Sequence, residues 1–193
     1  MTRTSWLQNR HIVLGVTGGI ACYKACELTR ELGRRGALVQ IVMTEAATAF
    51  VSPLTFQALT NREVRISVLD AKAEAGMSHI ELARWADLIL IAPCTANTLA
   101  QLASGQASDL LTTLWTASEC VKAIAPSMNQ QMWKHMQTQA NLALLIDLGV
   151  AVIGPDSGIQ ACGDIGSGRM TEPMEVVNTL ESQLARGPLA HRK

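Results

Sequence analysis

The 193-residue sequence lacks the features of a secreted or membrane-inserted protein. No apolar run approaches the roughly 20 residues that a membrane-spanning helix needs. Met1 to Arg10 do not contain the apolar core of a signal peptide. We therefore expect a cytoplasmic protein that does not enter the membrane.

An excess of charge of either sign is also missing. The chain has 16 basic and 16 acidic residues and contains no basic run. Such a balance gives no support for binding to nucleic acid or to an anionic membrane surface. We expect a small-molecule substrate instead.

A disulfide framework is absent too, because the five cysteines are odd in number and irregularly spaced. Cys22 and Cys26 are four residues apart on a predicted helix, which could indicate a metal site. No further Cys or His pair stands at zinc-ligand spacing. We therefore expect reduced thiols in the core and no metal.

Strand and helix signals alternate along the chain. The predicted strands cover residues 11–16, 38–43, 88–92, 121–125 and 150–153. The predicted helices cover residues 20–35, 53–59, 78–86, 96–102, 109–117, 138–148 and 173–184. The strands are apolar on both faces, as in a parallel sheet covered by helices. This predicts an α/β fold, a three-layer α/β/α sandwich with a Rossmann-like or flavodoxin-like doubly wound parallel sheet. We expect one domain over residues 1–193, with an ordered core at about 10–185 and a frayed tail at 186–193.

Small and hydroxyl-bearing residues follow the first strand. Gly18, Gly19 and Ile20 come between this strand and its helix, where backbone N–H groups can face a phosphate. Thr44, at the end of the second strand, adds a hydroxyl. The dinucleotide pattern Gly-x-Gly-x-x-Gly is absent, which disfavours NAD although Glu45 could mimic its ribose-binding acid. A tight turn without a ligand is the alternative.

Two further strand ends carry polar side chains. The sequence Thr95-Ala96-Asn97-Thr98 places two hydroxyls and an amide at a helix start, which suits a phosphate or the polar edge of a flavin. Asn129 stands among methionines and a tryptophan after the strand 121–125, which suggests one polar contact inside an apolar pocket. Each segment could equally be an ordinary capped helix start.

A histidine and a cysteine are the candidate reactive groups. Ser78 and Glu81 fit a capping box, which puts His79 at the first helical position, where the helix dipole favours a neutral imidazole able to act as a base. His11, His135, in a predicted polar helix, and His191 are more typical of structural or solvated positions. Residues 158–170 form a glycine-rich loop with Cys162, which indicates either a lid or a mobile loop with a spare thiol.

Together these stretches, in order from Ile12 to Met170, resemble the flavin-dependent cysteine decarboxylase family. The shared motifs are Gly-Gly-Ile, His-Ile-Glu-Leu-x-x-Trp-Ala-Asp, Pro-x-Thr-Ala-Asn-Thr, Pro-x-Met-Asn-x-x-Met-Trp and Ala-Cys-Gly-Asp-x-Gly-x-Gly-Arg-Met. The last motif looks most like the decarboxylase half of bacterial bifunctional decarboxylase–ligases. The 193 residues leave no room for the ligase half, so we expect either a stand-alone decarboxylase or the decarboxylase half of a longer protein.

The resemblance implies a carboxy-lyase that uses FMN to convert 4′-phosphopantothenoylcysteine to pantetheine 4′-phosphate in coenzyme A biosynthesis. In this family the substrate thiol is oxidised to a thioaldehyde, CO₂ leaves, and the product is reduced again. The implied roles are His79 as base, Asn129 as carboxylate ligand and Cys162 as proton donor. The implied substrate-binding residues are Met128, Asn129, Ala161 and Cys162.

The implied FMN-binding residues are Gly18, Gly19, Ile20, Thr44, Thr95, Ala96, Asn97 and Thr98. The resemblance also implies a homo-oligomer, either a trimer or a dodecamer built of trimers, with FMN between subunits. A peptidyl-cysteine decarboxylase of peptide-antibiotic maturation is an alternative, which the loop 158–170 disfavours. A non-catalytic flavin-binding regulatory subunit is another, which the presence of His79, Asn129 and Cys162 disfavours. A flavin prenyltransferase has a related fold without counterparts of His79 and Cys162.

Overall fold

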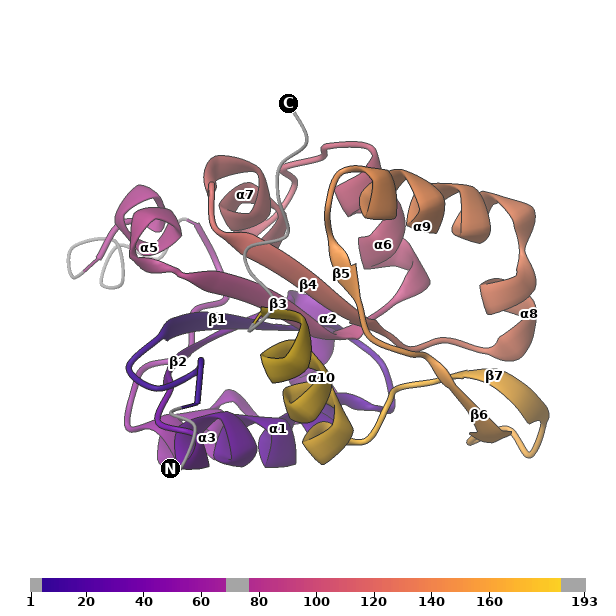
Figure 1. The fold of residues 1–193 in the computed structure, drawn as a ribbon, viewed down its shortest axis with the longest axis horizontal. Coiled ribbons are helices and arrows are strands. Elements are labelled where there is room, and N and C mark those ends of the chain that lie inside the picture. Colours follow the sequence, from indigo (N-terminus) through magenta and orange to yellow (C-terminus); the bar gives the residue numbers. More distant parts are fainter. Residues whose placement is uncertain (1–4, 69–76, 185–193) are drawn as a thin grey trace.

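The computed structural model describes residues 5–68 and 77–184 and contains a five-stranded parallel sheet (Figure 1). Its strand order is β2-β1-β3-β4-β5. The strands are β1 (His11–Val16), β2 (Leu38–Met43), β3 (Leu88–Cys94), β4 (Val121–Pro126) and β5 (Ala151–Val152). The predicted tail, with His191, lies outside the described residues.

Helices cover both faces of the sheet (Figure 1). One face carries α1 (Cys22–Arg34), α3 (Pro53–Thr60) and α10 (Pro173–Leu184); the other carries α5 (His79–Trp85), α6 (Ala96–Ala103), α7 (Leu110–Ala117) and α9 (Met136–Asp147). The short helices are α2 (Glu45–Thr48) and α8 (Gln130–Lys134). The fold is therefore the doubly wound sandwich that the alternating signals predict. No helix within residues 5–68 and 77–184 has both the length and the apolar character to cross a bilayer.

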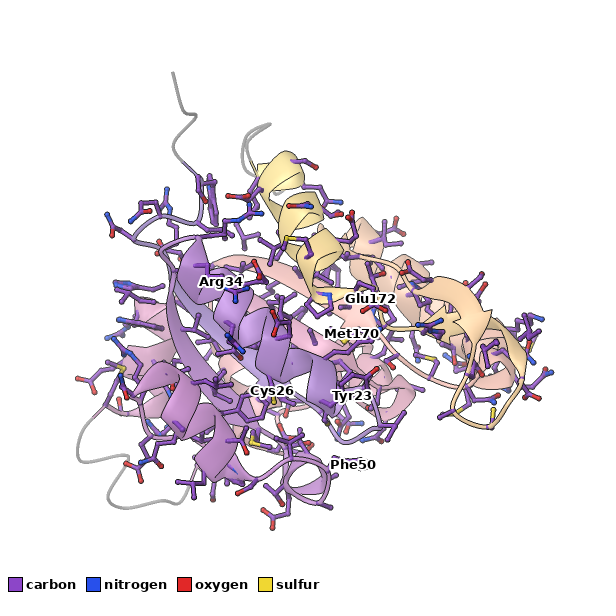
Figure 2. All side chains as sticks on the ribbon, turned by 90° about the horizontal axis from the view of Figure 1, so that it is seen from below. Tyr23, Cys26, Arg34, Phe50, Met170 and Glu172 are labelled. Carbon is purple, nitrogen blue, oxygen red and sulfur yellow. The ribbon has the colours of Figure 1, made fainter. Side chains whose placement is uncertain are left out.

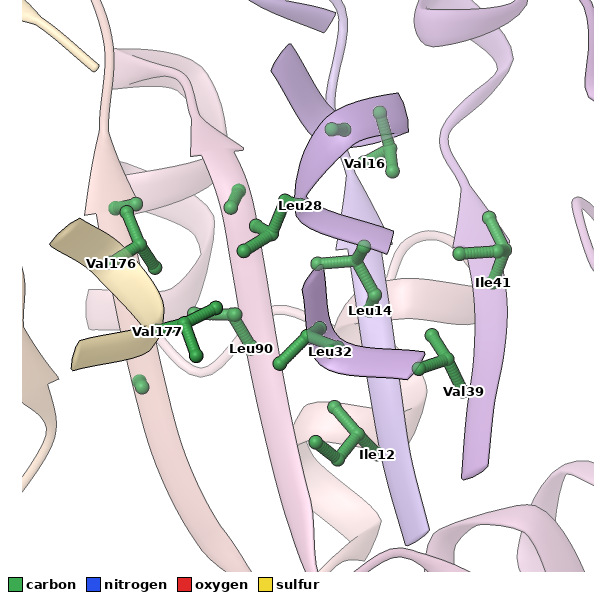
Figure 3. Close-up of a cluster of buried hydrophobic side chains, with 14 of the residues drawn as sticks. Ile12, Leu14, Val16, Leu28, Leu32, Val39, Ile41, Leu90, Val176 and Val177 are labelled. Atoms are coloured by element: carbon green, nitrogen blue, oxygen red, sulfur yellow. The ribbon is translucent and has the colours of Figure 1, made fainter. Parts of the chain in front are cut away.

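The core consists of two layers because successive strand residues point to opposite faces. Ile12 and Leu14 of β1 lie against α1 and α10, where Leu28 and Val177 are also buried (Figure 3). Val13 lies in the cluster on the other face. Every residue of β3 is buried, which explains the uninterrupted apolar run in the sequence.

Most predicted boundaries agree with the structure to within two residues, and the differences have local causes. β3 continues through Pro93 to Cys94, where its pairing with β4 changes register. The strand predicted at 150–153 is paired at two residues only. His135 does not lie inside a polar helix; it caps the start of α9 by accepting the N–H of Gln137.

The segment predicted as a glycine-rich loop is instead an antiparallel hairpin of β6 (Asp156–Ile159) and β7 (Ile165–Arg169). Its small residues hide the alternation that normally predicts a strand. Gly168 has a φ of +137°, and a Cβ there would lie 2.2 Å from the Met128 carbonyl oxygen. Glycine is therefore needed for β7 to approach the end of β4.

Lys24 of α1 links the first βα unit to the chain beyond this hairpin. Its buried ammonium donates to the Met170 carbonyl oxygen and to the Glu172 carboxylate, both at 2.7 Å. Met170 and Glu172 lie beside α1 in Figure 2. These bonds hold the start of α10 against α1, because a buried ammonium is stable only when it is paired.

We expect Lys24→Met to lower the free energy of unfolding by about 1–3 kcal/mol, since the Met170 carbonyl would lose its buried donor. Urea unfolding followed by circular dichroism measures this loss. Lys134→Met is the matched control, because it makes the same substitution at an exposed lysine of α8 and should stay within about 0.5 kcal/mol of the parent protein. Equal losses for both variants would contradict this account of the carbonyl contact.

Candidate functional site

The carboxyl ends of β1 and β3 bring together two of the predicted ligand-binding segments. These neighbouring strands continue the chain in opposite directions across the sheet, so the crevice between them is where open α/β sheets bind ligands. Gly18 and Gly19 follow β1, and Thr95 to Thr98 follow β3. The two predicted segments therefore lie at the same edge of the sheet.

Thr17 fastens these two segments to each other. Its buried hydroxyl donates to the Pro93 carbonyl oxygen at 2.7 Å and accepts the Thr95 N–H at 3.2 Å. Thr95 in turn caps α6 by accepting the N–H of Thr98 at 3.2 Å. One hydroxyl therefore sets the spacing between the two walls of the crevice.

A cavity of about 550 Å³ lies at this edge, a size within the range of about 300–1,000 Å³ typical of small-molecule sites. Six of the eight predicted cofactor residues line it, namely Gly18, Thr44, Thr95, Ala96, Asn97 and Thr98. Gly19 is not among its lining residues, and Ile20 lines a neighbouring cavity.

Two details of this cavity suit a bound polar cofactor. The Thr44 hydroxyl is buried and has no hydrogen-bond partner among the described residues, although Thr44 stands at the N-cap of α2. Such a hydroxyl usually has an explanation in a missing ligand or water. At Gly18, a Cβ would lie 2.6 Å from the Cβ of Ala46, so the turn can approach α2 only with glycine.

A second cavity, of about 560 Å³, contains all four predicted substrate-binding residues. Met128, Asn129, Ala161 and Cys162 line it together with Ile20, Tyr23 and Lys24. Met128 lines both cavities, so the two spaces adjoin at this residue. A ligand in one cavity can therefore lie next to a ligand in the other.

Asn129 combines the two roles that the sequence left open. It is the N-cap of α8, and its Oδ1 accepts the N–H of Gln131 at 2.8 Å. This bond turns its Nδ2 toward the hairpin, 3.6 Å from Cys162 Sγ. The cap therefore orients the amide donor into the second cavity.

Cys162 lies at the turn of the hairpin and is the exposed member of the five free cysteines. Cys22 and Cys94 are buried, and burial raises the pKa of both thiols. Burial also keeps both thiol groups away from a substrate in either cavity. Cys162 is therefore the thiol best placed to meet a substrate.

His79 is not brought to this site within one chain. It follows the N-cap Ser78 in α5, and the predicted capping box with Glu81 is present. The Ser78 N–H lowers the pKa of the Glu81 carboxyl. Along the longest axis of the molecule, α5 and the β6–β7 hairpin lie at opposite ends (Figure 1). His79 lines neither cavity described above.

The sequence did not single out Thr17, Lys24 or Gln160. The role of Thr17 depends on its hydrogen bond to Pro93, which is 76 residues away in the sequence. Gln160 bonds to the segment that contains Asn129, about 30 residues earlier. Nothing in the local sequence marks such distant partners.

Comparison with known proteins places these features in context. The family model described as Flavoprotein matches residues 2–185. The coenzyme A biosynthesis bifunctional protein CoaBC of Vibrio cholerae serotype O1 is 55% identical over 179 residues, which are 93% of this chain and 45% of that protein. The chain thus spans less than half the length of this curated relative.

Two solved structures are similar over nearly their whole length. A PPC decarboxylase mutant complexed with pantothenoylaminoethenethiol has a TM-score of 0.81 and 31% identity, covering 92% of this chain and all of that chain. The FMN binding protein AtHal3 has a TM-score of 0.78 and 30% identity, covering 93% of this chain and 99% of that chain.

We expect Thr17→Val to lower the free energy of unfolding by about 1–3 kcal/mol, because it leaves the Pro93 carbonyl and the Thr95 N–H unsatisfied. Flavin content after purification, read from absorbance, should fall with it. The control Thr116→Val changes an exposed threonine of α7 and should stay within about 0.5 kcal/mol of the parent protein. Parent-like stability and flavin content in Thr17→Val would refute the proposed link between the two segments.

Proposed function

Because the chain belongs to the Flavoprotein family, we propose that it catalyses the FMN-dependent decarboxylation of 4′-phosphopantothenoylcysteine to pantetheine 4′-phosphate in coenzyme A biosynthesis. The observation that carries the proposal is the approach of Asn129 to Cys162 in a cavity that adjoins the predicted cofactor cavity across Met128. The similarity to a PPC decarboxylase over that protein's whole chain supports the same substrate.

FMN is the proposed cofactor of the first cavity. Gly18 and the segment Thr95 to Thr98 would hold it, and the Thr44 hydroxyl would gain the partner that it lacks among the described residues. Bound FMN would supply two-electron chemistry, accepting a pair of electrons and a proton equivalent from the substrate CH₂–SH group and returning them after CO₂ has left. A carboxylate on an ordinary cysteine has no adjacent electron sink, which is why decarboxylation needs this oxidation.

Asn129 is proposed to bind the substrate carboxylate. Its Oδ1 is engaged with Gln131, so the cavity side of the amide presents the Nδ2 donor that an anionic carboxylate accepts. Cys162 is proposed to donate a proton to the enethiolate carbon that CO₂ loss leaves behind. The hairpin carries this thiol to within 3.6 Å of the Asn129 amide, which puts donor and carboxylate site together.

His79 is proposed to accept the substrate thiol proton in a site shared between two copies of the chain. Since α5 lies far from Cys162 in one chain, a second copy would have to supply His79. Large apolar side chains remain exposed at Ile20, Tyr23 and Phe50, and Figure 2 shows the latter two near the N-terminal end of α1. These side chains suit a subunit interface, and we propose a homotrimer or a dodecamer of trimers.

The FMN-loaded protein should release CO₂ from 4′-phosphopantothenoylcysteine and form pantetheine 4′-phosphate. Cys162→Ser should still release CO₂ but should end at an oxidised enethiol two hydrogens lighter, because a serine hydroxyl is a far weaker acid than a thiol. Mass spectrometry of the products measures both outcomes. Failure of the unmodified enzyme to act, with activity on peptides ending in cysteine instead, would overturn the proposed substrate.

A shared site predicts that two inactive variants rescue each other. We expect His79→Asn to lose about 10²–10⁴-fold in rate, as is typical for removal of a general base. Asn129→Asp should also be inactive, because its charge repels the substrate carboxylate. Coexpression in equal amounts should place both original residues in roughly a quarter of the shared sites of a randomly assembled oligomer. CO₂ release by the mixed oligomer should rise to about that fraction of the parent rate.

The matched control coexpresses Asn129→Asp with a chain that carries both substitutions. No site in that mixture can contain both original residues, so its rate should not rise above that of Asn129→Asp alone. A mixed oligomer of the two single variants that stays inactive would show that a second copy does not supply His79.

A further inference from the structure

The Gln160 side chain joins three segments of the site. Its Oε1 accepts the backbone N–H of Gln130 at 3.0 Å and lies 3.4 Å from Asn129 Nδ2. Its Nε2 donates to the Met128 carbonyl oxygen at 3.3 Å and to the Ser167 carbonyl oxygen at 3.4 Å. Both ends of the amide are therefore engaged, one with the start of α8 and the other with the end of β4 and with β7.

The backbone of Gln160 fixes the turn that carries Cys162. Its N–H donates to the Asp164 carbonyl oxygen at 2.8 Å, and its carbonyl oxygen accepts the Gly163 N–H at 2.9 Å. These bonds close the turn on either side of Cys162. The same residue thus shapes the turn through its backbone and attaches it to the Met128–Gln130 segment through its side chain.

The glycines of β7 permit this close attachment. The Met128 N–H donates to the Gly168 carbonyl oxygen at 2.9 Å, and a Cβ at Gly168 would lie 2.8 Å from Gln160 Nε2. A Cβ at Gly166 would lie 2.2 Å from Gln130 Oε1. The hairpin therefore packs closely against the segment that contains Asn129, and the Gln160 side chain bonds to both.

We propose that Gln160 is a positioning residue that holds the Cys162 thiol over the carboxylate site of Asn129. The inference rests on the proposed function, because it assigns Gln160 to the step in which Cys162 protonates the enethiolate carbon. Cys162 Sγ has its described contacts with Asn129 Nδ2 and, at 4.0 Å, with Gln160 Oε1. Without the Gln160 amide, the strands of the hairpin keep their pairing, but the thiol loses its fixed distance from Asn129.

The reaction separates this role from general stability. Oxidation and CO₂ loss do not require Cys162, whereas the final protonation does. A displaced thiol should therefore let the oxidised enethiol escape, with its two electrons left on the cofactor, before a proton arrives. A merely structural defect would lower the yield of active enzyme and leave the ratio of the two products unchanged.

The experiment compares Gln160→Ala with Ser157→Ala in the FMN-loaded enzyme. Ser157 bonds to Ser167 across the hairpin at 2.8 Å and makes no described contact with the Met128–Gln130 segment, so its loss weakens the hairpin alone. We expect Gln160→Ala to raise the ratio of oxidised enethiol to pantetheine 4′-phosphate about tenfold or more, since a displacement of about 1 Å can change a rate by up to about 10²-fold. Ser157→Ala should change this ratio by less than about twofold. Gln160→Met, which keeps the length of the side chain without its hydrogen bonds, replaces Gln160→Ala if that variant does not fold.

A second measurement does not depend on turnover. Alkylation of Cys162 by iodoacetamide, followed by peptide mass spectrometry, should be on the order of tenfold faster in Gln160→Ala, which corresponds to a loss of about 1.4 kcal/mol of anchoring. If the parent enzyme makes no product, the proposed function fails while this rate still reports on the anchor. Unchanged product ratio and alkylation rate in Gln160→Ala, or equal changes in Ser157→Ala, would overturn the inference.

Discussion

The hydroxyl of Thr17 is the contact on which the arrangement of the site depends. In a parallel sheet the loops beyond two strands are free to spread apart, because the backbone ladder ends with the strands. Thr17 bonds to Pro93 and Thr95 beyond the end of that ladder, so the first loop and the start of α6 keep a fixed separation. The first cavity lies between these two segments, and the position of Thr44 relative to them follows from the pairing of β1 with β2.

Much of this fold could be predicted because strands that are buried on both faces of the sheet appear in the sequence as continuous apolar runs. The bounds of β1, β2 and α10 agree with the prediction to the residue, and the predicted capping box at Ser78 marks where α5 begins. Six residues that line the first cavity could be predicted for a related reason. Ligands of open α/β sheets bind at the carboxyl ends of the strands, and those ends can be read from the apolar runs.

What could not be predicted depends on partners distant in the sequence. The strands of the β6–β7 hairpin are rich in glycine and serine, so they show no clear alternation of apolar and polar residues. Gln160 resembles any polar residue of a loop until the fold brings it to Gln130. The position of His79 is a different case: its local setting in a capping box follows from the sequence, whereas its distance from Cys162 follows from the order of the strands.

Met128 lies between the two cavities, and its backbone and its side chain differ in mobility. Its backbone is held on both sides by the hairpin, through its N–H to Gly168 and its carbonyl to Gln160, while its side chain is an unbranched thioether that can adopt several shapes. The Met128 backbone is therefore fixed in position, whereas its side chain can change conformation. If the proposed function holds, the main chain would set where the substrate carboxylate binds, and the flexible thioether would adapt to the ligands on either side of it.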